Sequence, residues 1–161
     1  MALTRDIAAT YRHPRVVLRR LLAMGEREDR ALVMLMAGCI LMFVAQWPRL
    51  SRIAYESGRE LNPLLGGSLF AWVMIAPLLF YALAFLSYLV LRALGQKCSG
   101  YATRLALFWA FLAATPLILL HGLVAGFIGP GPEQVVVGAL WLLAFLWFWM
   151  SNLREAGWHT Q

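Results

Sequence analysis

Four long stretches without a charged residue constrain this chain more than any other feature. They cover residues 31–47, 64–91, 105–128 and 135–150, and all 14 Lys/Arg and 8 Asp/Glu residues fall outside them. About 20 apolar residues in helical geometry cross a hydrocarbon core of roughly 30 Å. In lipid the backbone polar groups must bond to one another, which a helix achieves within one segment. The sequence therefore predicts an all-α membrane protein, a four-span transmembrane helical bundle.

The composition agrees with this assignment. Hydrophobic residues make up 61% of the chain and charged residues 14%, whereas about a quarter of a typical soluble domain is charged. This composition excludes a disordered chain, a nucleic-acid-binding domain and most soluble enzymes. We therefore divide the chain into a basic cytoplasmic segment at residues 1–30, a transmembrane domain at residues 31–153 and a short cytoplasmic tail at residues 154–161.

The basic segment before the first span predicts an amphipathic helix in the membrane interface. Pro14 suits a first helical turn, and Val17 and Leu21 would share one face of the helix. The other side carries Arg12, Arg15, Arg19 and Arg20. A basic amphipathic helix of this kind lies on anionic lipid. We expect these arginines to contact the anionic lipid of the cytoplasmic face, and the net charge of +6 requires no nucleic acid.

Proline and glycine mark the breaks between the spans. Trp47 and Pro48 are expected to end the first span, because Trp favours the headgroup layer and Pro interrupts a helix. Residues 49–55 would then form a short surface helix, and Asn62 with Pro63 would start the second span. The Gly-Pro-Gly-Pro sequence at residues 129–132 predicts a sharp turn, which makes the third and fourth spans antiparallel neighbours.

The distribution of Lys and Arg predicts the orientation of the bundle. One side carries seven of these residues before the first span, three between the second and third spans, and one in the tail. The other side carries three, all between the first and second spans. Cytoplasmic loops of membrane proteins hold an excess of Lys and Arg. The side with eleven of these residues is therefore expected to face the cytoplasm, and both termini lie on it. We expect a multi-pass protein of the bacterial inner membrane.

The predicted spans hold few of the groups that catalysis needs. No Asp, Glu, Lys or Arg lies in them, and His121 is their single imidazole. Ser68, Ser87 and Thr115 are hydroxyls without a base beside them, and an unactivated hydroxyl is a poor nucleophile. No His-Glu-x-x-His or other paired metal pattern occurs. The sequence predicts a protein that is not an enzyme and has no cofactor or metal.

Five residues near the middle of the bundle each have two interpretations. Pro77 and Pro116 fall at similar depths in the second and third spans, where they either kink the helices or form a broken-helix transport site. His121 is either a neutral side chain hydrogen-bonded between helices or a contact for a proton or substrate. Gly122 and Gly126 form a small-xxx-small face that packs either within the chain or against a second copy.

The stretch that follows the second span resembles a known family. Residues 94–101 read Leu-Gly-Gln-Lys-Cys-Ser-Gly-Tyr and lead into a span with the step Thr115-Pro116-Leu117. This pattern is similar to the Gly-x-x-Gly/Ser-aromatic loop and small-residue-Pro step of the Yip family (Rab/Ypt-interacting-protein-like) of small multi-span membrane proteins. The likeness covers most of residues 1–153, with four predicted spans where that family usually has five and without its Asp-Leu-Tyr-Gly-Pro signature. Resemblance to the eukaryotic members of that family implies interaction with Rab-type GTPases. This chain is more similar to the prokaryote-like members, and that resemblance implies the fold and leaves the activity open.

These observations lead to two hypotheses about function. The first is a Yip-like, non-enzymatic scaffold or accessory protein that binds membrane partners or organises lipid, alone or as a homo-oligomer. The second is a small transporter or channel that uses the kinked second and third spans around His121. A flux assay in liposomes separates the two.

Overall fold

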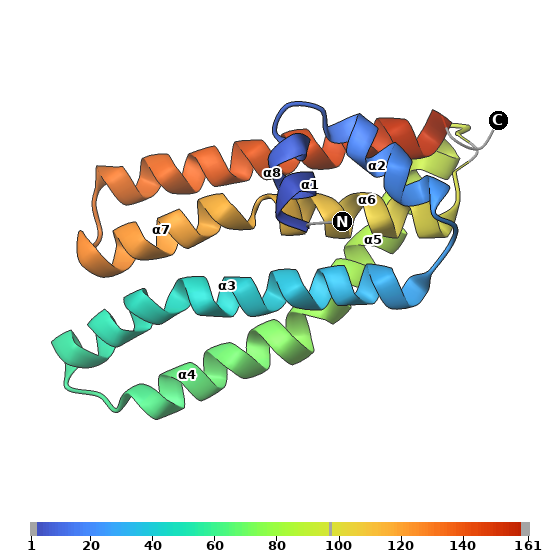
Figure 1. Cartoon of the computed structure of the whole chain (residues 1–161). Coiled ribbons are helices and arrows are strands. Elements are labelled where there is room, and N and C mark those ends of the chain that lie inside the picture. Colours follow the sequence, from blue (N-terminus) through green and yellow to red (C-terminus); the bar gives the residue numbers. More distant parts are fainter. Residues whose placement is uncertain (1–2, 97, 159–161) are drawn as a thin grey trace.

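The computed structural model describes residues 3–96 and 98–158, and this part of the chain contains helices and no strand. The helices are α1 (Leu3–Thr10), α2 (Pro14–Ala23), α3 (Glu28–Ser57), α4 (Leu61–Phe70), the π-helical turn η1 (Ala71–Ile75), α5 (Ala76–Ala93), α6 (Gly100–Ala113), α7 (Thr115–Phe127) and α8 (Pro132–Trp158). The turns after α3 and α7 lie at one end of the bundle, and α2 lies toward the other, beside the last turns of α8 (Figure 1).

Three helical stretches are long and apolar enough to cross a membrane, namely Glu28–Ser57, Leu61–Ala93 and Pro132–Gly157. Helices α6 and α7, bent by 40° at a short break, make a fourth span where the pair is counted as one. The prediction of an all-α bundle of membrane-spanning helices is thus confirmed, with three or four spans for the four predicted. Such a set of helices is typical of a multi-pass membrane protein.

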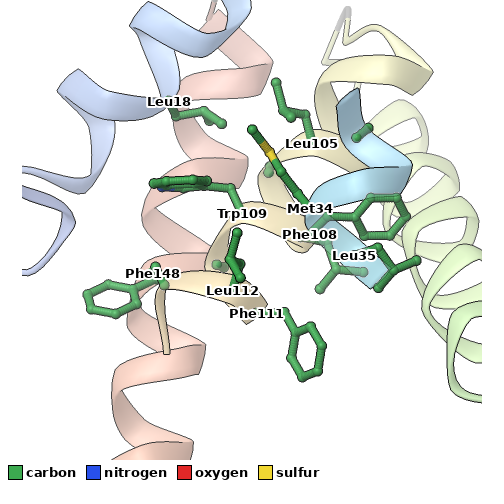
Figure 2. Close-up of a cluster of buried hydrophobic side chains, with 14 of the residues drawn as sticks. Leu18, Met34, Leu35, Leu105, Phe108, Trp109, Phe111, Leu112 and Phe148 are labelled. Carbon is green, nitrogen blue, oxygen red and sulfur yellow. The ribbon is translucent and has the colours of Figure 1, made fainter. Parts of the chain in front are cut away.

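Helix α6 forms the core of the bundle. No residue from Leu105 to Ala114 is more than 2% exposed. The side chains around it come from α2, α3, α5 and α8. Figure 2 shows Trp109 of α6 between Leu18 of α2 and Phe148 of α8. In contrast, Leu78 and Phe85 of α5 are 71% and 61% exposed. The outer helices therefore leave apolar side chains free for lipid, while α6 is enclosed by protein.

The first span is longer than predicted, because helix α3 does not end at Pro48. It continues through Pro48 to Ser57, so the expected surface helix at residues 49–55 is its last part. Proline removes one backbone bond from a helix, and a membrane helix tolerates this where neighbouring helices pack against the break. An ion pair of 2.7 Å from Arg52 to Glu56, four residues apart, supports the extension. Gly58 ends the helix with φ 63°, a left-handed conformation that favours glycine.

The two prolines near the middle of the bundle interrupt their helices differently. Pro77 lies in the first turn of α5, directly after the π-helical turn, and the helical stretch runs on from Leu61 to Ala93. Pro116 lies in the first turn of α7, after the 40° bend. Because Pro116 has no N–H for the carbonyl of Leu112, that oxygen accepts a 2.7 Å hydrogen bond from the Thr115 hydroxyl instead.

The start of the second span is one residue earlier than Asn62. Helix α4 begins at Leu61 with Glu60 as the capping position, and Glu60 makes no capping hydrogen bond through its side chain. Pro63 still falls in the first turn, where its missing N–H costs nothing.

Candidate functional site

The amphipathic helix predicted before the first span is present as α2, but protein rather than lipid covers its apolar face. Val17, Leu18 and Leu21 are at most 4% exposed and belong to the same buried cluster as α6. Helix α2 packs on α8 and α6 (Figure 1). The expectation that this face enters the membrane interface is therefore corrected. Apolar side chains are stable both in lipid and in a protein core. The packing of α2 on α6 and α8 places these side chains in the core.

The four arginines of this segment have unequal roles. Arg19 forms an ion pair of 2.8 Å with Glu155 of α8, and the hydrogen bond and charge of Glu155 raise the pKa of Arg19. Arg20 forms an ion pair of 3.2 Å with Asp6 of α1. Arg12 and Arg15 form no ion pair with any residue that the structure describes. Two of the four thus dock the N-terminal helices, and two remain available to a ligand or partner.

A cationic cavity lies where α2 meets the end of α8. It has a volume of about 380 Å³ and is lined by Arg15, Arg19, Arg154 and Glu155. Three arginines against one glutamate leave its lining with a formal charge of +2. We call this the arginine pocket. Arg154 belongs to the predicted tail, and no pattern in the sequence connects it with Arg15 and Arg19.

Helix α1 is held against the core by a polar contact that the sequence did not indicate. The indole N–H of Trp109, which is 0% exposed, donates a 3.1 Å hydrogen bond to the Thr10 hydroxyl. The ring of Tyr11 meets the ring of Phe148 edge to face, with centroids 5.0 Å apart. Burial raises the pKa of Tyr11. These contacts join residues 99 and 137 positions apart, which no local pattern reveals.

The small-residue face of α7 packs within the chain. A Cβ added to Gly122 would lie 1.8 Å from the carbonyl oxygen of Ala45, and one added to Gly126 would lie 2.3 Å from Cβ of Pro48. Both partners belong to α3, so α7 approaches α3 at the proline itself. The Arg52 guanidinium donates a 3.2 Å hydrogen bond to the carbonyl of Gly126. This face is occupied by α3, and a second copy of the chain would have to displace α3 to use it.

His121 lies beside two polar residues of α3, Gln46 within the predicted first span and Arg49 beyond its predicted end. A cavity of about 90 Å³ between α3 and α7 is lined by Gln46, Arg49 and His121, together with apolar and small residues. Gln46 accepts a 3.3 Å hydrogen bond from Ser68 of α4. The hydrogen bond expected for the His121 ring has no partner among residues 3–96 and 98–158. The continuation of α3 through Pro48 is the reason that Arg49 reaches this depth.

The two prolines do not meet at this cavity. Residues of α3 and α7 form its lining, and neither Pro77 nor Pro116 is part of it. Helix α3 lies between α4 and α7 (Figure 1). A transport path at His121 would thus run between the first and third spans, where the sequence analysis expected the second and third.

The amide side chain of Asn152 is buried in the core, which the sequence did not indicate. Asn152 is 0% exposed, and its side-chain nitrogen donates a 3.2 Å hydrogen bond to the carbonyl of Ala106 in α6. Its side-chain oxygen is buried without a hydrogen-bond partner. The predicted fourth span ends at residue 150, so this asparagine falls just beyond it, whereas α8 carries it into the core.

The described part of the chain contains no group of three His, Cys, Asp or Glu residues placed to hold a metal ion. The hollows of this part of the chain include the arginine pocket and the small polar cavity at His121. Comparison with models of known protein families, with curated proteins and with solved structures finds no match.

Proposed function

We propose that this protein is a Yip-like, non-enzymatic scaffold or accessory protein of the bacterial inner membrane, with both termini in the cytoplasm. It acts by binding a membrane partner or by organising lipid at its basic end. The arginine pocket carries this proposal, because a lining of formal charge +2 at one end of a membrane bundle favours an anionic ligand. Arg15 of this pocket is exposed, and the exposed Arg12 in the turn between α1 and α2 adds a further positive charge to this segment.

Affinity purification in native lipid particles tests this role. The variant is Arg12→Glu with Arg15→Glu, two exposed positions without an ion-pair partner in the described chain, so the fold is expected to persist. Arg59→Glu is the matched control, since Arg59 is exposed at the opposite end. We expect the wild-type protein and the control to retain the same partner or anionic lipid, and the double variant to lose it. Identical material with all three proteins would contradict the proposal.

The orientation has its own test. The excess of Lys and Arg at the end that carries α2 predicts that this end faces the cytoplasm. In intact cells, Cys98 or a cysteine placed after residue 150 should resist a membrane-impermeant thiol reagent, while Gly131→Cys should react. Cysteine-free protein serves as the background. Labelling of the tail from outside would refute the four-span topology with both termini in the cytoplasm.

A small transporter or channel is the second candidate function, and the polar cavity at His121 favours it. The lining contains Gln46 and Arg49 but no carboxylate that would stabilise a proton or a metal cation in transit. We therefore expect His121→Leu and Pro116→Ala to insert and fold with stability within about 1 kcal/mol of wild type. Wild-type liposomes should show no pH-dependent flux. A flux that disappears in folded His121→Leu protein would replace the scaffold proposal with transport.

A further inference from the structure

An apolar groove of about 450 Å³ lies between α5 and α8, toward the end of the bundle that holds α2. Both helices pack on α6, which separates them and leaves the groove open. Its apolar lining includes Leu86, Val90, Leu94, Trp149, Met150 and Leu153. The volume falls within the range of roughly 300–1,000 Å³ found for small-molecule sites. Leu86 and Val90 are 57% and 51% exposed, so the walls are accessible.

The groove has a cationic end. Arg154 lines the groove and also lines the arginine pocket, so the two hollows meet at this side chain. The polar residue Gln96 lies in the groove lining as well. Arg154 is exposed and has no ion-pair partner within the described residues. An elongated apolar channel with positive charge at one end matches a molecule with an apolar chain and an anionic head.

We propose that the groove and the arginine pocket together bind one anionic glycerophospholipid from the adjacent leaflet. One acyl chain lies between α5 and α8 along Leu86 and Val90. The phosphate lies at Arg154, within reach of the charge of Arg15 and Arg19. Basic pockets between membrane helices bind phosphate headgroups in this way. The inference rests on the proposed function and specifies which lipid chemistry the basic end takes.

The headgroup must supply the preference for this lipid. The groove opens toward lipid, and an acyl chain that enters it leaves one apolar environment for another, so the hydrophobic gain is small. The arginines are different, because each basic residue near an anionic charge contributes about a five-fold change in affinity. Two lipids with identical chains and different headgroups should therefore bind differently.

The test measures lipid binding to delipidated, full-length protein in detergent by native mass spectrometry. The probes are dioleoyl phosphatidylglycerol, dioleoyl phosphatidylcholine and inorganic phosphate. We expect wild-type protein to prefer phosphatidylglycerol, and Arg154→Gln to lose about five-fold in affinity for it. The loss for phosphatidylcholine should be smaller, because its choline cation offsets the charge of its phosphate. Arg59→Gln, at the opposite end, should bind like wild type. Inorganic phosphate should not compete, since it lacks the chain that the groove holds.

A second pair of variants tests the groove itself. Leu86→Trp should weaken phosphatidylglycerol binding by filling the groove, whereas Leu89→Trp should not, because Leu89 is 44% exposed on α5 but lines no part of the groove. Equal affinity for the two lipids, or competition by phosphate alone, would overturn the inference. So would equal effects of the two tryptophans. None of these outcomes alters the flux or partner measurements, so the scaffold proposal stands or fails separately.

Discussion

Replacing Gly122 with alanine is expected to destabilise the protein by about 3 kcal/mol, the upper end of the usual cost of overpacking. The added Cβ would lie 1.8 Å from the carbonyl oxygen of Ala45 and 2.7 Å from its carbonyl carbon. Backbone atoms cannot rotate away as a flexible side chain would, so α7 has to move off α3. Reversible unfolding in mixed detergent micelles, followed by circular dichroism, measures the change in free energy.

Gly66→Ala is the matched control for this substitution. Gly66 is also a helical glycine of a membrane span, and a Cβ there meets nothing within 4 Å. Alanine favours a helix over glycine by about 1 kcal/mol, so Gly66→Ala should be neutral or slightly stabilising. If Gly122→Ala proved as stable as Gly66→Ala, the close packing of α7 on α3 would be wrong. Gly126→Ala should behave like Gly122→Ala, because its Cβ would lie 2.3 Å from Pro48.

Trp109→Ala is expected to cost about 3–5 kcal/mol, the range for removal of a large buried aromatic side chain. Trp109 is 0% exposed at the centre of the core and also carries the hydrogen bond to Thr10. We expect the substitution to release α1 and α2 from the bundle as well as to leave a cavity. Limited proteolysis of residues 1–25 measures the release, and detergent unfolding measures the stability.

Two further variants separate the packing from the hydrogen bond. Trp109→Phe keeps an aromatic ring but cannot donate to Thr10, so proteolysis should rise while most of the stability remains. Trp147→Ala should change little, because Trp147 of α8 is 65% exposed and faces away from the core. Equal losses from Trp109→Ala and Trp147→Ala would show that α6 is not the core helix.

The candidate site was only partly predictable from the sequence. The arginines of α2 were recognisable because their spacing along one helix is local information. The arginine pocket was not, since it needs Arg154, which lies 135 positions after Arg19. The polar surroundings of His121 were missed for another reason. Proline usually ends a helix, but α3 continues beyond Pro48 and carries Arg49 to the cavity.

Hydropathy and glycine–proline chemistry by themselves determined most of the helices of this protein and the turns that connect them, the end of α3 beyond Pro48 being the exception. Both depend on neighbours along the chain, since an apolar run must satisfy its own backbone in lipid and Gly58 must supply a left-handed turn. Only the tertiary structure decided which apolar helix is enclosed. Leucines suit lipid and protein equally, so the sequence of α6 resembles that of α5, yet Leu105 is 0% exposed and Leu78 is 71% exposed. The same physical reason governs α2, whose apolar face could rest on lipid and instead packs on α6 and α8.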